Sequence, residues 1–345
     1  MLIATETLMF AEAAEAASVV ARQHAANAML MTTLAARLRA ADPQIIFTCA
    51  RGSSDHAATF ARHLFETRLN IPTLSQAPSI SSIYGGPLLH MRGQPFILVS
   101  QSGKSPDLLL SAKAARDAGA LVIAFVNDTA SPLASLAEIV VPLHAGPEKS
   151  VAATKSYLAT LAAFVQLLGA LTGDATLQDA TSVLPDTMHA AWQADWSAGV
   201  DFFAEARSMF VLGRGPSLGA AQEAALKFKE TTGIHAEAFS IAEVVHGPMA
   251  LVGPDFPVLV LPPFDRAAAG LERTLASFAD RGARLAVAGG AFDGALMLPV
   301  APDLHPVIAP IAMIQSFYRF VNALSVQRGY DPDRPPMLRK VTETR

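Results

Sequence analysis

Phe96-Ile97-Leu98-Val99-Ser100-Gln101-Ser102-Gly103-Lys104-Ser105 joins a short apolar run to a loop rich in serine. The apolar run is typical of a strand buried on both faces, and the loop predicts the passage from that strand into a helix. In a parallel sheet such a passage lies at the carboxyl edge, where open α/β folds bind ligands. Small hydroxylated residues let backbone N–H groups approach an anion, and the helix N-terminus adds a favourable dipole. The stretch therefore predicts an α/β fold with an anion-binding loop.

The same loop is also compatible with a plain polar turn in which Ser105 caps the following helix. A second Ser/Gly turn, Arg51-Gly52-Ser53-Ser54, follows the apolar strand 45–49, and this repetition favours phosphate. The side chains of Ser100, Ser102 and Ser105 offer hydroxyl donors, and Gln101 offers an amide. The Gly-x-x-x-x-Gly-Lys-Ser/Thr loop of nucleotide hydrolases does not occur in the sequence, which disfavours a nucleoside triphosphate.

Composition limits the class of protein. The chain has 345 residues, 51% of them hydrophobic and 16% charged, which argues against disorder and allows two domains. The formal net charge is −4 without a run of Lys or Arg, so we expect neither nucleic-acid nor membrane binding. Cys49 is the single cysteine, which excludes an intramolecular disulfide and fits a reducing compartment. The first residues lack a basic start before an apolar run, and the stretch 158–171 is too short to span a bilayer; we expect a cytoplasmic protein.

Strands and helices alternate twice along the chain. Apolar strands at 45–49, 96–99 and 121–126 are separated by helical segments, which predicts a parallel sheet covered on both faces. The order returns at 209–212, and aligning Arg51 with Arg214 gives an offset of 163 residues (214 − 51). The same offset pairs Asp117-Ala-Gly-Ala with Asp280-Arg-Gly-Ala, which favours an internal duplication. We expect a helical segment at 1–41, domains at 42–185 and 198–330, and a tail at 331–345 over the active site.

Charged residues gather in the second half of the chain. Glu223, Lys227 and Glu230 are spaced i, i+4, i+7 and share one face of a predicted helix. A carboxylate beside a lysine is suited to proton transfer, although spacing alone favours a solvated face with ion pairs. The ionisable residues that follow, His235, Glu237, Glu243 and His246, favour the catalytic interpretation.

His246 precedes Gly-Pro, so we expect it in a turn, with its ring facing a cleft or satisfying a backbone carbonyl. A histidine titrates near neutral pH, which suits proton transfer. Lys340 lies in a short proline-rich tail that is either a disordered end or, if pinned, a cover for a ligand. The sequence has no HExxH or similar ligand spacing, so we expect no metal and no cofactor.

Together these segments resemble the sugar isomerase (SIS) domain family, and in particular the tandem-SIS isomerase half of glucosamine-6-phosphate synthase. The resemblance runs from about Ile45 to Thr344 and implies two tandem SIS domains, each a three-layer α/β/α sandwich. Its most specific stretches are Ser100-Gln-Ser-Gly, Ala153-Thr-Lys155, Glu223-Ala-Ala-Leu-Lys-Phe-Lys-Glu230, Ile234-His-Ala-Glu-Ala238, His246-Gly-Pro-Met-Ala-Leu251 and Leu338-Arg-Lys340-Val-Thr.

The resemblance assigns a role to each candidate residue. It implies phosphate binding by Ser54, Ser100, Gln101, Ser102 and Ser105, and further substrate contacts by Gly52, Ser53, Ala153 and Thr154. Glu230 then moves a proton between C1 and C2 with help from Lys227, and His246 opens the ring in the neighbouring subunit's site. Lys340 matches the lysine that forms an imine in the synthase. Two departures bear on substrate recognition: Ala153 replaces a serine of the family, and Asp55 replaces an aromatic residue.

The synthase begins with a glutaminase domain, and this sequence has no segment that resembles it. We therefore expect a glucosamine-6-phosphate deaminase of the SIS type, a homodimer with shared active sites. The alternatives are a deaminase or deglycase for galactosamine 6-phosphate or a fructosamine phosphate, an ammonia-dependent synthase subunit, or a non-catalytic sugar-phosphate sensor.

Overall fold

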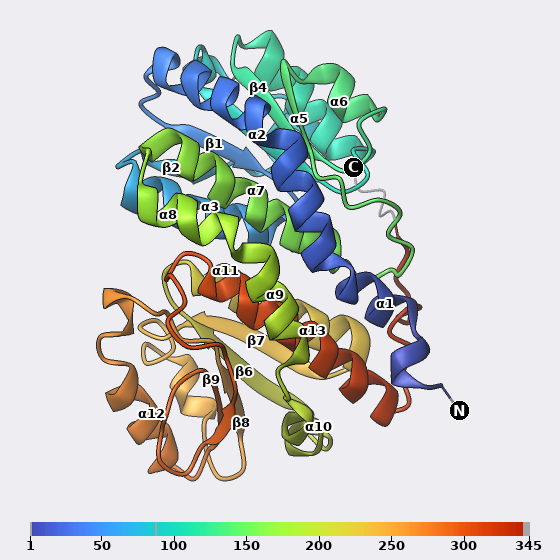
Figure 1. Ribbon diagram of the computed structural model, residues 1–345, viewed down its shortest axis with the longest axis vertical. Coiled ribbons are helices and arrows are strands. Elements are labelled where there is room, and N and C mark those ends of the chain that lie inside the picture. The colour runs from blue at the N-terminus through green and yellow to red at the C-terminus, as the bar shows by residue number, and fades with distance from the viewer. Residues whose placement is uncertain (1, 87, 341–345) are drawn as a thin grey trace. The chain divides into compact units, whose positions relative to one another are not determined.

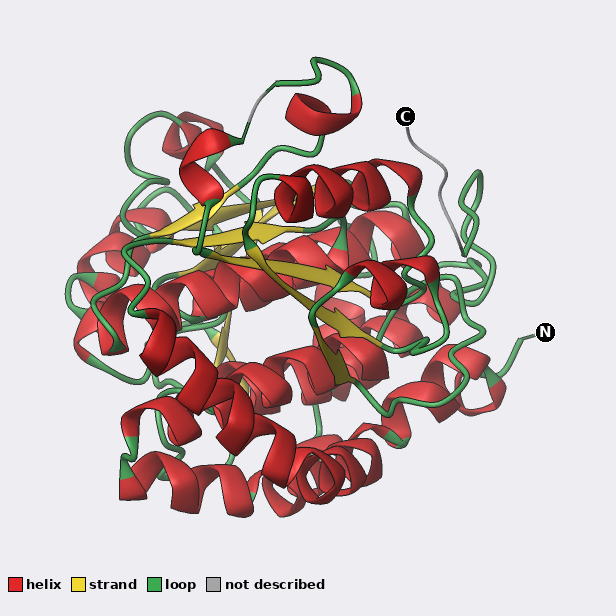
Figure 2. Cartoon of the chain, turned by 90° about the horizontal axis from the view of Figure 1, so that it is seen from above, coloured by secondary structure: helices red, strands yellow, loops and turns green. Residues whose placement is uncertain are grey.

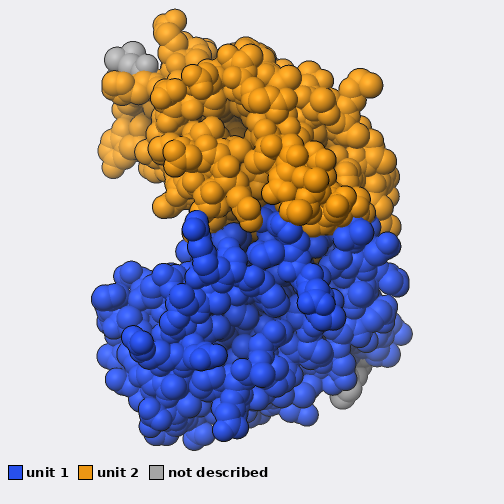
Figure 3. Space-filling view, turned by 60° about the vertical axis from the view of Figure 1, so that its left-hand side comes forward, with its two compact units in different colours: residues 1–17, 149–154, 183–338 blue, residues 18–148, 155–182, 339–345 orange. Residues whose placement is uncertain are grey.

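The computed structural model describes residues 2–86 and 88–340, which form two compact units. Unit 2 holds residues 18–148, 155–182 and 339–340, and unit 1 holds residues 2–17, 149–154 and 183–338 (Figure 3). Each unit contains one parallel five-stranded sheet with helices along it (Figure 1). The expected ranges 42–185 and 198–330 contain one sheet each.

The sheet of unit 2 has the strand order β2-β1-β3-β4-β5, and all of its pairs are parallel. The strands are β1 (Ile46–Cys49), β2 (Thr73–Ser75), β3 (Pro95–Ser100), β4 (Leu121–Val126) and β5 (Ile139–Pro142). The helical elements are α2 (Ala16–Ala41), α3 (Ser53–Arg68), α4 (Ser79–Ser82), η2 (Leu89–Met91), α5 (Pro106–Asp117), α6 (Pro132–Leu136), α7 (Lys155–Thr172) and α8 (Ala175–Ser182).

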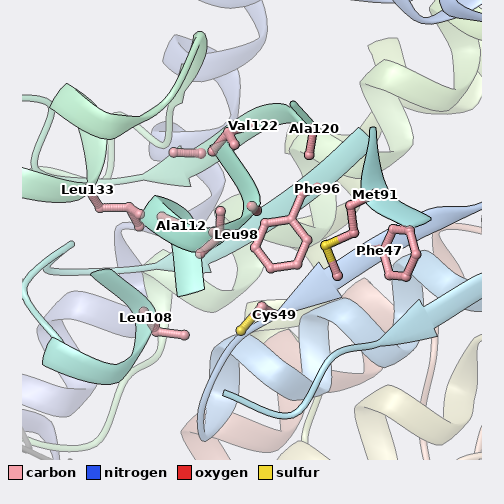
Figure 4. Packing of buried hydrophobic residues seen from close by; sticks show 12 residues of the cluster. Phe47, Cys49, Met91, Phe96, Leu98, Leu108, Ala112, Ala120, Val122 and Leu133 are labelled. Atoms are coloured by element: carbon pink, nitrogen blue, oxygen red, sulfur yellow. The ribbon is translucent and has the colours of Figure 1, made fainter. Parts of the chain in front are cut away.

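Both faces of this sheet are covered, which explains the apolar character of its central strands. On one face, alternate residues of β1, β3 and β4, such as Cys49, Leu98 and Val122, pack against α5 (Figure 4). On the other face Phe125 of β4 stacks on Phe164 of α7, with ring centroids 4.5 Å apart, and Phe65 of α3 meets the same ring at 6.0 Å. The continuous apolar pattern of the sequence thus reflects burial from two sides.

The sheet of unit 1 has the order β7-β6-β8-β9-β10, again parallel throughout. Its strands are β6 (Ser208–Gly213), β7 (His235–Ser240), β8 (Pro257–Val260), β9 (Arg284–Ala288) and β10 (Leu296–Leu298). Its helical elements are η1 (Ala4–Glu6), α1 (Leu8–Ala14), α9 (Leu184–Gln193), α10 (Ser197–Phe203), α11 (Ser217–Lys227), the π-helical turn η3 (Phe228–Thr232), η4 (Pro248–Leu251), η5 (Arg266–Ala268), α12 (Leu271–Ala279) and α13 (Ala309–Gln327).

The two sheets share one topology. Matching β1 to β6, and each later strand to its counterpart, turns one strand order into the other. In both, the first strand lies between the second and the third. Figure 2 shows helices on both sides of the sheet that is in front in that view. The prediction of two tandem parallel sheets flanked by helices is confirmed.

One helix, α7, is long and apolar enough to cross a membrane, which the shorter apolar stretch quoted from the sequence did not indicate. However, 83% of that segment is buried, as is usual for the central helix of a folded domain. Its packing against the β4 face accounts for its apolar composition.

Candidate active site

The two strand-end turns singled out in the sequence line one cavity of unit 2. β1 and β3 are adjacent parallel strands, so the turns that follow them meet at the carboxyl edge of the sheet. The cavity has a volume of about 350 Å³, within the range of small-molecule sites. Its lining residues are Arg51, Gly52, Ser54, Val99, Ser100, Gln101, Ser102, Ser105, Leu108 and Lys340. The structure therefore brings together seven of the predicted site residues from three distant parts of the chain: Gly52, Ser54, Ser100, Gln101, Ser102, Ser105 and Lys340.

The serine loop is folded by its own side chains. The Ser100 hydroxyl oxygen accepts a hydrogen bond from the backbone N–H of Gly103 at 3.0 Å, and the Ser102 hydroxyl accepts from the N–H of Lys104 at 3.3 Å. Each hydroxyl accepts in these bonds and keeps its own proton for donation. The loop thus presents O–H donors to the cavity, as an anion requires.

Ser105 is the N-cap residue of α5, but its side chain makes no capping hydrogen bond. The carbonyl of Ser105 accepts the first helical bond, from the N–H of Leu109 at 3.1 Å. Ser105 lines the cavity and its side chain does not cap the helix, so the simple capping role does not describe this residue.

A buried ion pair joins the two turns of the cavity. Asp107, in the first turn of α5, is 0% exposed, and its Oδ2 accepts from Arg51 Nε at 2.9 Å and lies 2.8 Å from Arg51 Nη2. The Arg51 side chain is 53% exposed. The neighbouring Asp55 is half-buried, and burial raises the pKa of its carboxyl, while His56 and Arg51 oppose this rise.

Lys340 is held in the cavity by a second buried carboxylate. Glu148 Oε2 lies 3.2 Å from Lys340 Nζ and accepts from the Ser156 hydroxyl at 2.6 Å. The backbone N–H of Ser156 donates to Oε1 of the same carboxylate at 3.1 Å. The described part of the expected tail ends at Lys340, which lines the cavity, and residues 341–345 lie outside the described residues.

The charged residues of α11 form a buried network in unit 1. Lys227 is 0% exposed, and its Nζ lies 3.3 Å from Glu223 Oε1 and 2.5 Å from Glu230 Oε2. Burial by itself lowers the pKa of Lys227, but the carboxylates of Glu223 and Glu230 outweigh burial and raise this pKa above its ordinary value. The ammonium therefore stays charged beside Glu230, and the solvated ion-pair face is not what the structure has.

Glu230 lies just beyond the end of α11, in the π-helical turn η3. Such turns occur mostly as single insertions and often at functional sites. Glu223 also accepts a hydrogen bond from the Tyr318 hydroxyl of α13, at 2.9 Å. The network thus ends in a partly exposed carboxylate, since 20% of the Glu230 side chain is accessible.

The remaining predicted residues are less closely grouped. His246 is exposed in a turn between β7 and η4, as its Gly-Pro neighbour predicts, and His235 and Glu237 are exposed on β7. Ser53 begins α3 and does not line the cavity, while Ala153 and Thr154 belong to unit 1. Within residues 2–86 and 88–340, no three His, Cys, Asp or Glu side chains are arranged to hold a metal ion.

Four residues of these clusters were missed by sequence reasoning: Arg51, Asp107, Glu148 and Tyr318. Their partners lie far away in the sequence: Asp107 is 56 positions after Arg51, and Lys340 is 192 positions after Glu148. A charged residue two positions after the end of a buried strand, as Arg51 is, is the one local signal that was available.

The model of the SIS domain matches residues 40–170 and 202–288, which is more than half of the chain. The chain belongs to the SIS domain family. The two matched segments contain nine of the ten strands, and the first includes both serine turns of the cavity. The resemblance that the sequence motifs indicated is therefore confirmed.

Relatives of this SIS protein include the glutamine–fructose-6-phosphate aminotransferase [isomerizing] of Zymomonas mobilis, 31% identical over 84% of this chain and 50% of the relative. The chain spans about half the length of the curated relatives it matches. Among solved structures, a candidate phosphosugar isomerase from Silicibacter pomeroyi is 40% identical, with a TM-score of 0.90 over 95% of this chain and all of that one. A glucosamine-6-phosphate deaminase from Thermotoga maritima shares the fold, with a TM-score of 0.78 at 20% identity over 98% of this chain and 100% of that one.

Proposed function

We propose that the protein is a phosphosugar isomerase that converts glucosamine 6-phosphate and water to fructose 6-phosphate and ammonia. The observation that carries this proposal is the cavity of unit 2, in which two serine turns and the amine of Lys340 converge. Hydroxyl donors at the start of α5 suit a phosphate group, and an amine beside them suits a sugar carbonyl. The names of the relatives support the same class of substrate.

The proposed reaction is a proton transfer followed by hydrolysis. His246 assists ring opening, and Glu230 takes the proton from C2 of the open-chain amino aldose and returns it to C1. The product is a C2 imine, which water converts to the ketone with release of ammonia. Lys227, whose charge Glu223 maintains, donates a hydrogen bond to Oε2 of Glu230 and so holds this carboxyl group in place for the proton transfer.

A second candidate is the reverse reaction, in which fructose 6-phosphate and ammonia yield the amino sugar. The relatives named as isomerizing aminotransferases favour it, because the same proton transfer operates in both directions. Galactosamine 6-phosphate and fructosamine phosphates remain alternative substrates for the first direction.

The decisive experiment measures, without added cofactor, the release of ammonia from glucosamine 6-phosphate and galactosamine 6-phosphate and the release of lysine from fructoselysine phosphate. The reverse assay supplies fructose 6-phosphate with ammonium and detects amino sugar phosphate. Release of ammonia fastest from glucosamine 6-phosphate is the expected result. If these compounds raise the thermal stability of the protein but are not turned over in either direction, the protein is a non-catalytic sensor and the enzymatic proposal is wrong.

Replacing Glu230 tests its assignment. Glu230→Gln removes the base and keeps the shape of the side chain, so kcat is expected to fall by about 10²–10⁴-fold. Glu237→Gln is the matched control, because that carboxylate is exposed on β7. If Glu230→Gln folds as well as the wild type and keeps the same turnover, Glu230 is not the base of the reaction.

A further inference from the structure

The neutral side chains of the cavity leave a charge to be balanced. The hydroxyl and amide groups of Ser54, Ser100, Gln101, Ser102 and Ser105 are uncharged donors. A sugar phosphate carries between one and two negative charges near neutral pH. Two cationic side chains line the cavity among the described residues, those of Lys340 and Arg51. The amine of Lys340 is paired with Glu148, which leaves the guanidinium of Arg51 to be explained.

Asp107 holds one side of the Arg51 guanidinium and leaves the other side available. Both measured contacts, from Nε and Nη2, converge on the same oxygen, Oδ2 of Asp107. The other oxygen, Oδ1, accepts the N–H of Leu108. A guanidinium has five N–H donors in a planar fork, so the edge that carries Nη1 keeps donors for a ligand. Because Asp107 is fully buried, it holds the Nε and Nη2 side of the Arg51 guanidinium in a fixed position beside the cavity.

Lys104 is the natural competitor for this role, since it lies within the serine loop itself. Its Nζ instead pairs with Asp128 at 3.2 Å, with 55% of its side chain exposed, and it does not line the cavity. Because Arg51 lines the cavity and Lys104 does not, Arg51 is the better candidate to balance the charge of a bound phosphate.

We propose that Arg51 binds the phosphate group of the substrate, and that Asp107 orients its guanidinium for this contact. The inference rests on the proposed sugar-phosphate substrate and adds a specific charged partner to it. Arginine matches the geometry of phosphate oxygens, and such charge-assisted hydrogen bonds are stronger than neutral ones. The residue thus makes the cavity prefer a doubly charged phosphate to an uncharged sugar.

A different role for the same pair makes a distinct prediction. If Arg51 only neutralised Asp107, its loss would weaken phosphate binding by exposing a negative charge next to the loop. Removing that negative charge with Asp107→Asn would then abolish the effect of Arg51→Met. If Arg51 contacts the phosphate, Arg51→Met weakens binding in both backgrounds, and the effect is smaller in Asp107→Asn because Asp107 no longer orients the guanidinium. The two backgrounds therefore separate contact from neutralisation.

The experiment is calorimetric titration of the full chain with inorganic phosphate and with fructose 6-phosphate, and fructose serves as the uncharged reference. Arg51→Met is expected to raise both phosphate dissociation constants roughly ten- to hundredfold and to leave the response to fructose unchanged. Arg51→Lys keeps the charge but loses the fork, and it is expected to fall between wild type and Arg51→Met. Lys104→Met is the matched control, with a change of less than about twofold because its charge is exposed and paired.

The outcomes keep this inference separate from the proposed reaction. Phosphate affinity that is unchanged in Arg51→Met, or restored by adding Asp107→Asn, overturns the inference even if ammonia is released. Conversely, loss of affinity in both backgrounds supports it even if no amino sugar phosphate is turned over, because binding is measured without catalysis.

Discussion

Three buried carboxylates each hold one basic side chain: Asp107 holds Arg51, Glu148 holds Lys340, and Glu223 holds Lys227. A buried charge that loses its partner is strongly destabilising, by about 3–5 kcal/mol, so each pair fixes its basic group firmly. In each unit, therefore, basic groups are positioned by buried carboxylates that need not touch a substrate.

Sequence spacing revealed one of these three pairs. Glu223 and Lys227 are four residues apart on a helix, so their contact follows from helical geometry. The other two pairs join residues that the folded sheet brings together, and no local pattern marks them. The roles of the individual site residues stay predictions, since the structure contributes their placement and not their chemistry.

The Tyr318 hydroxyl provides a test of the buried network. Tyr318→Phe removes one donor to the fully buried carboxylate of Glu223, so the free energy of unfolding is expected to fall by about 1–3 kcal/mol. Urea unfolding followed by fluorescence measures this change. Tyr84→Phe is the control, since that residue is 75% exposed. If both variants lose the same free energy of unfolding, the hydrogen bond from Tyr318 to Glu223 does not contribute to stability.

Cys49 gives a prediction about pH. Burial raises the pKa of its thiol to about 12 from an ordinary value of 9.0, while the Ser111 hydroxyl opposes this rise. The folded pKa lies above the unfolded one, so this contribution to stability is complete below about pH 9 and is lost between pH 9 and 12. Alkylation by iodoacetamide at pH 8.5 is therefore expected to be about a thousandfold slower in the native protein than in urea. Comparable rates in both states would show that the thiol is accessible.

At the level of elements, the central strands were predictable and the edge strands were not. β3 and β4 are continuous apolar runs because both of their faces are covered, and the sequence predicts them within a residue or two. β2 and β10 have three residues each, and β7 alternates exposed His235 and Glu237 with buried Ala236. Such short or polar edge strands carry too little hydrophobic pattern to be recognised alone.

The end of α11 also departs from expectation. A single helix through Glu230 was expected, whereas the α-helix ends at Lys227 and a π-helical turn follows. The hydroxyls of Thr231 and Thr232 donate to the carbonyls four residues earlier, and Gly233 then adopts φ +68°. Threonine side chains that bond to backbone carbonyls are known to distort helices, but the local sequence does not reveal a π turn.

Gly103 supplies a prediction for the serine loop. Its φ is +63°, and a Cβ there would lie 2.2 Å from Ser131 Oγ. Gly103→Ala is therefore expected to displace the loop and to weaken phosphate binding at least tenfold, by about 1.4 kcal/mol or more. Calorimetry with inorganic phosphate measures this effect.

Gly146→Ala is the matched control for that variant. Gly146 also has a positive φ, +67°, but a Cβ there meets no atom within 4 Å. Its cost is backbone strain alone, about 1–3 kcal/mol of stability, with phosphate affinity retained. Equal loss of affinity in both variants would mean that strain, and not the contact with Ser131, controls the loop.

For the whole molecule, the exposed position of His246 suggests a test of shared sites. If His246 serves the partner's site in a homodimer, mixing Glu230→Gln with His246→Ala creates heterodimers with one intact site. Subunit exchange is then expected to restore about a quarter of wild-type activity, since half of the dimers are mixed and one of their two sites is complete. Ammonia release after exchange measures it. Mixed dimers demonstrated by mass spectrometry but inactive would show that each subunit uses its own histidine.

Unit 2 is assembled from segments that the ribosome makes at different times. Residues 18–148 and 155–182 emerge early, whereas Lys340 follows only after the whole stretch 183–338. Domains generally fold as they are synthesised, so the first sheet with its serine turns can form long before that lysine is translated. A nascent chain therefore acquires the serine-lined part of the cavity first and the amine beside it last.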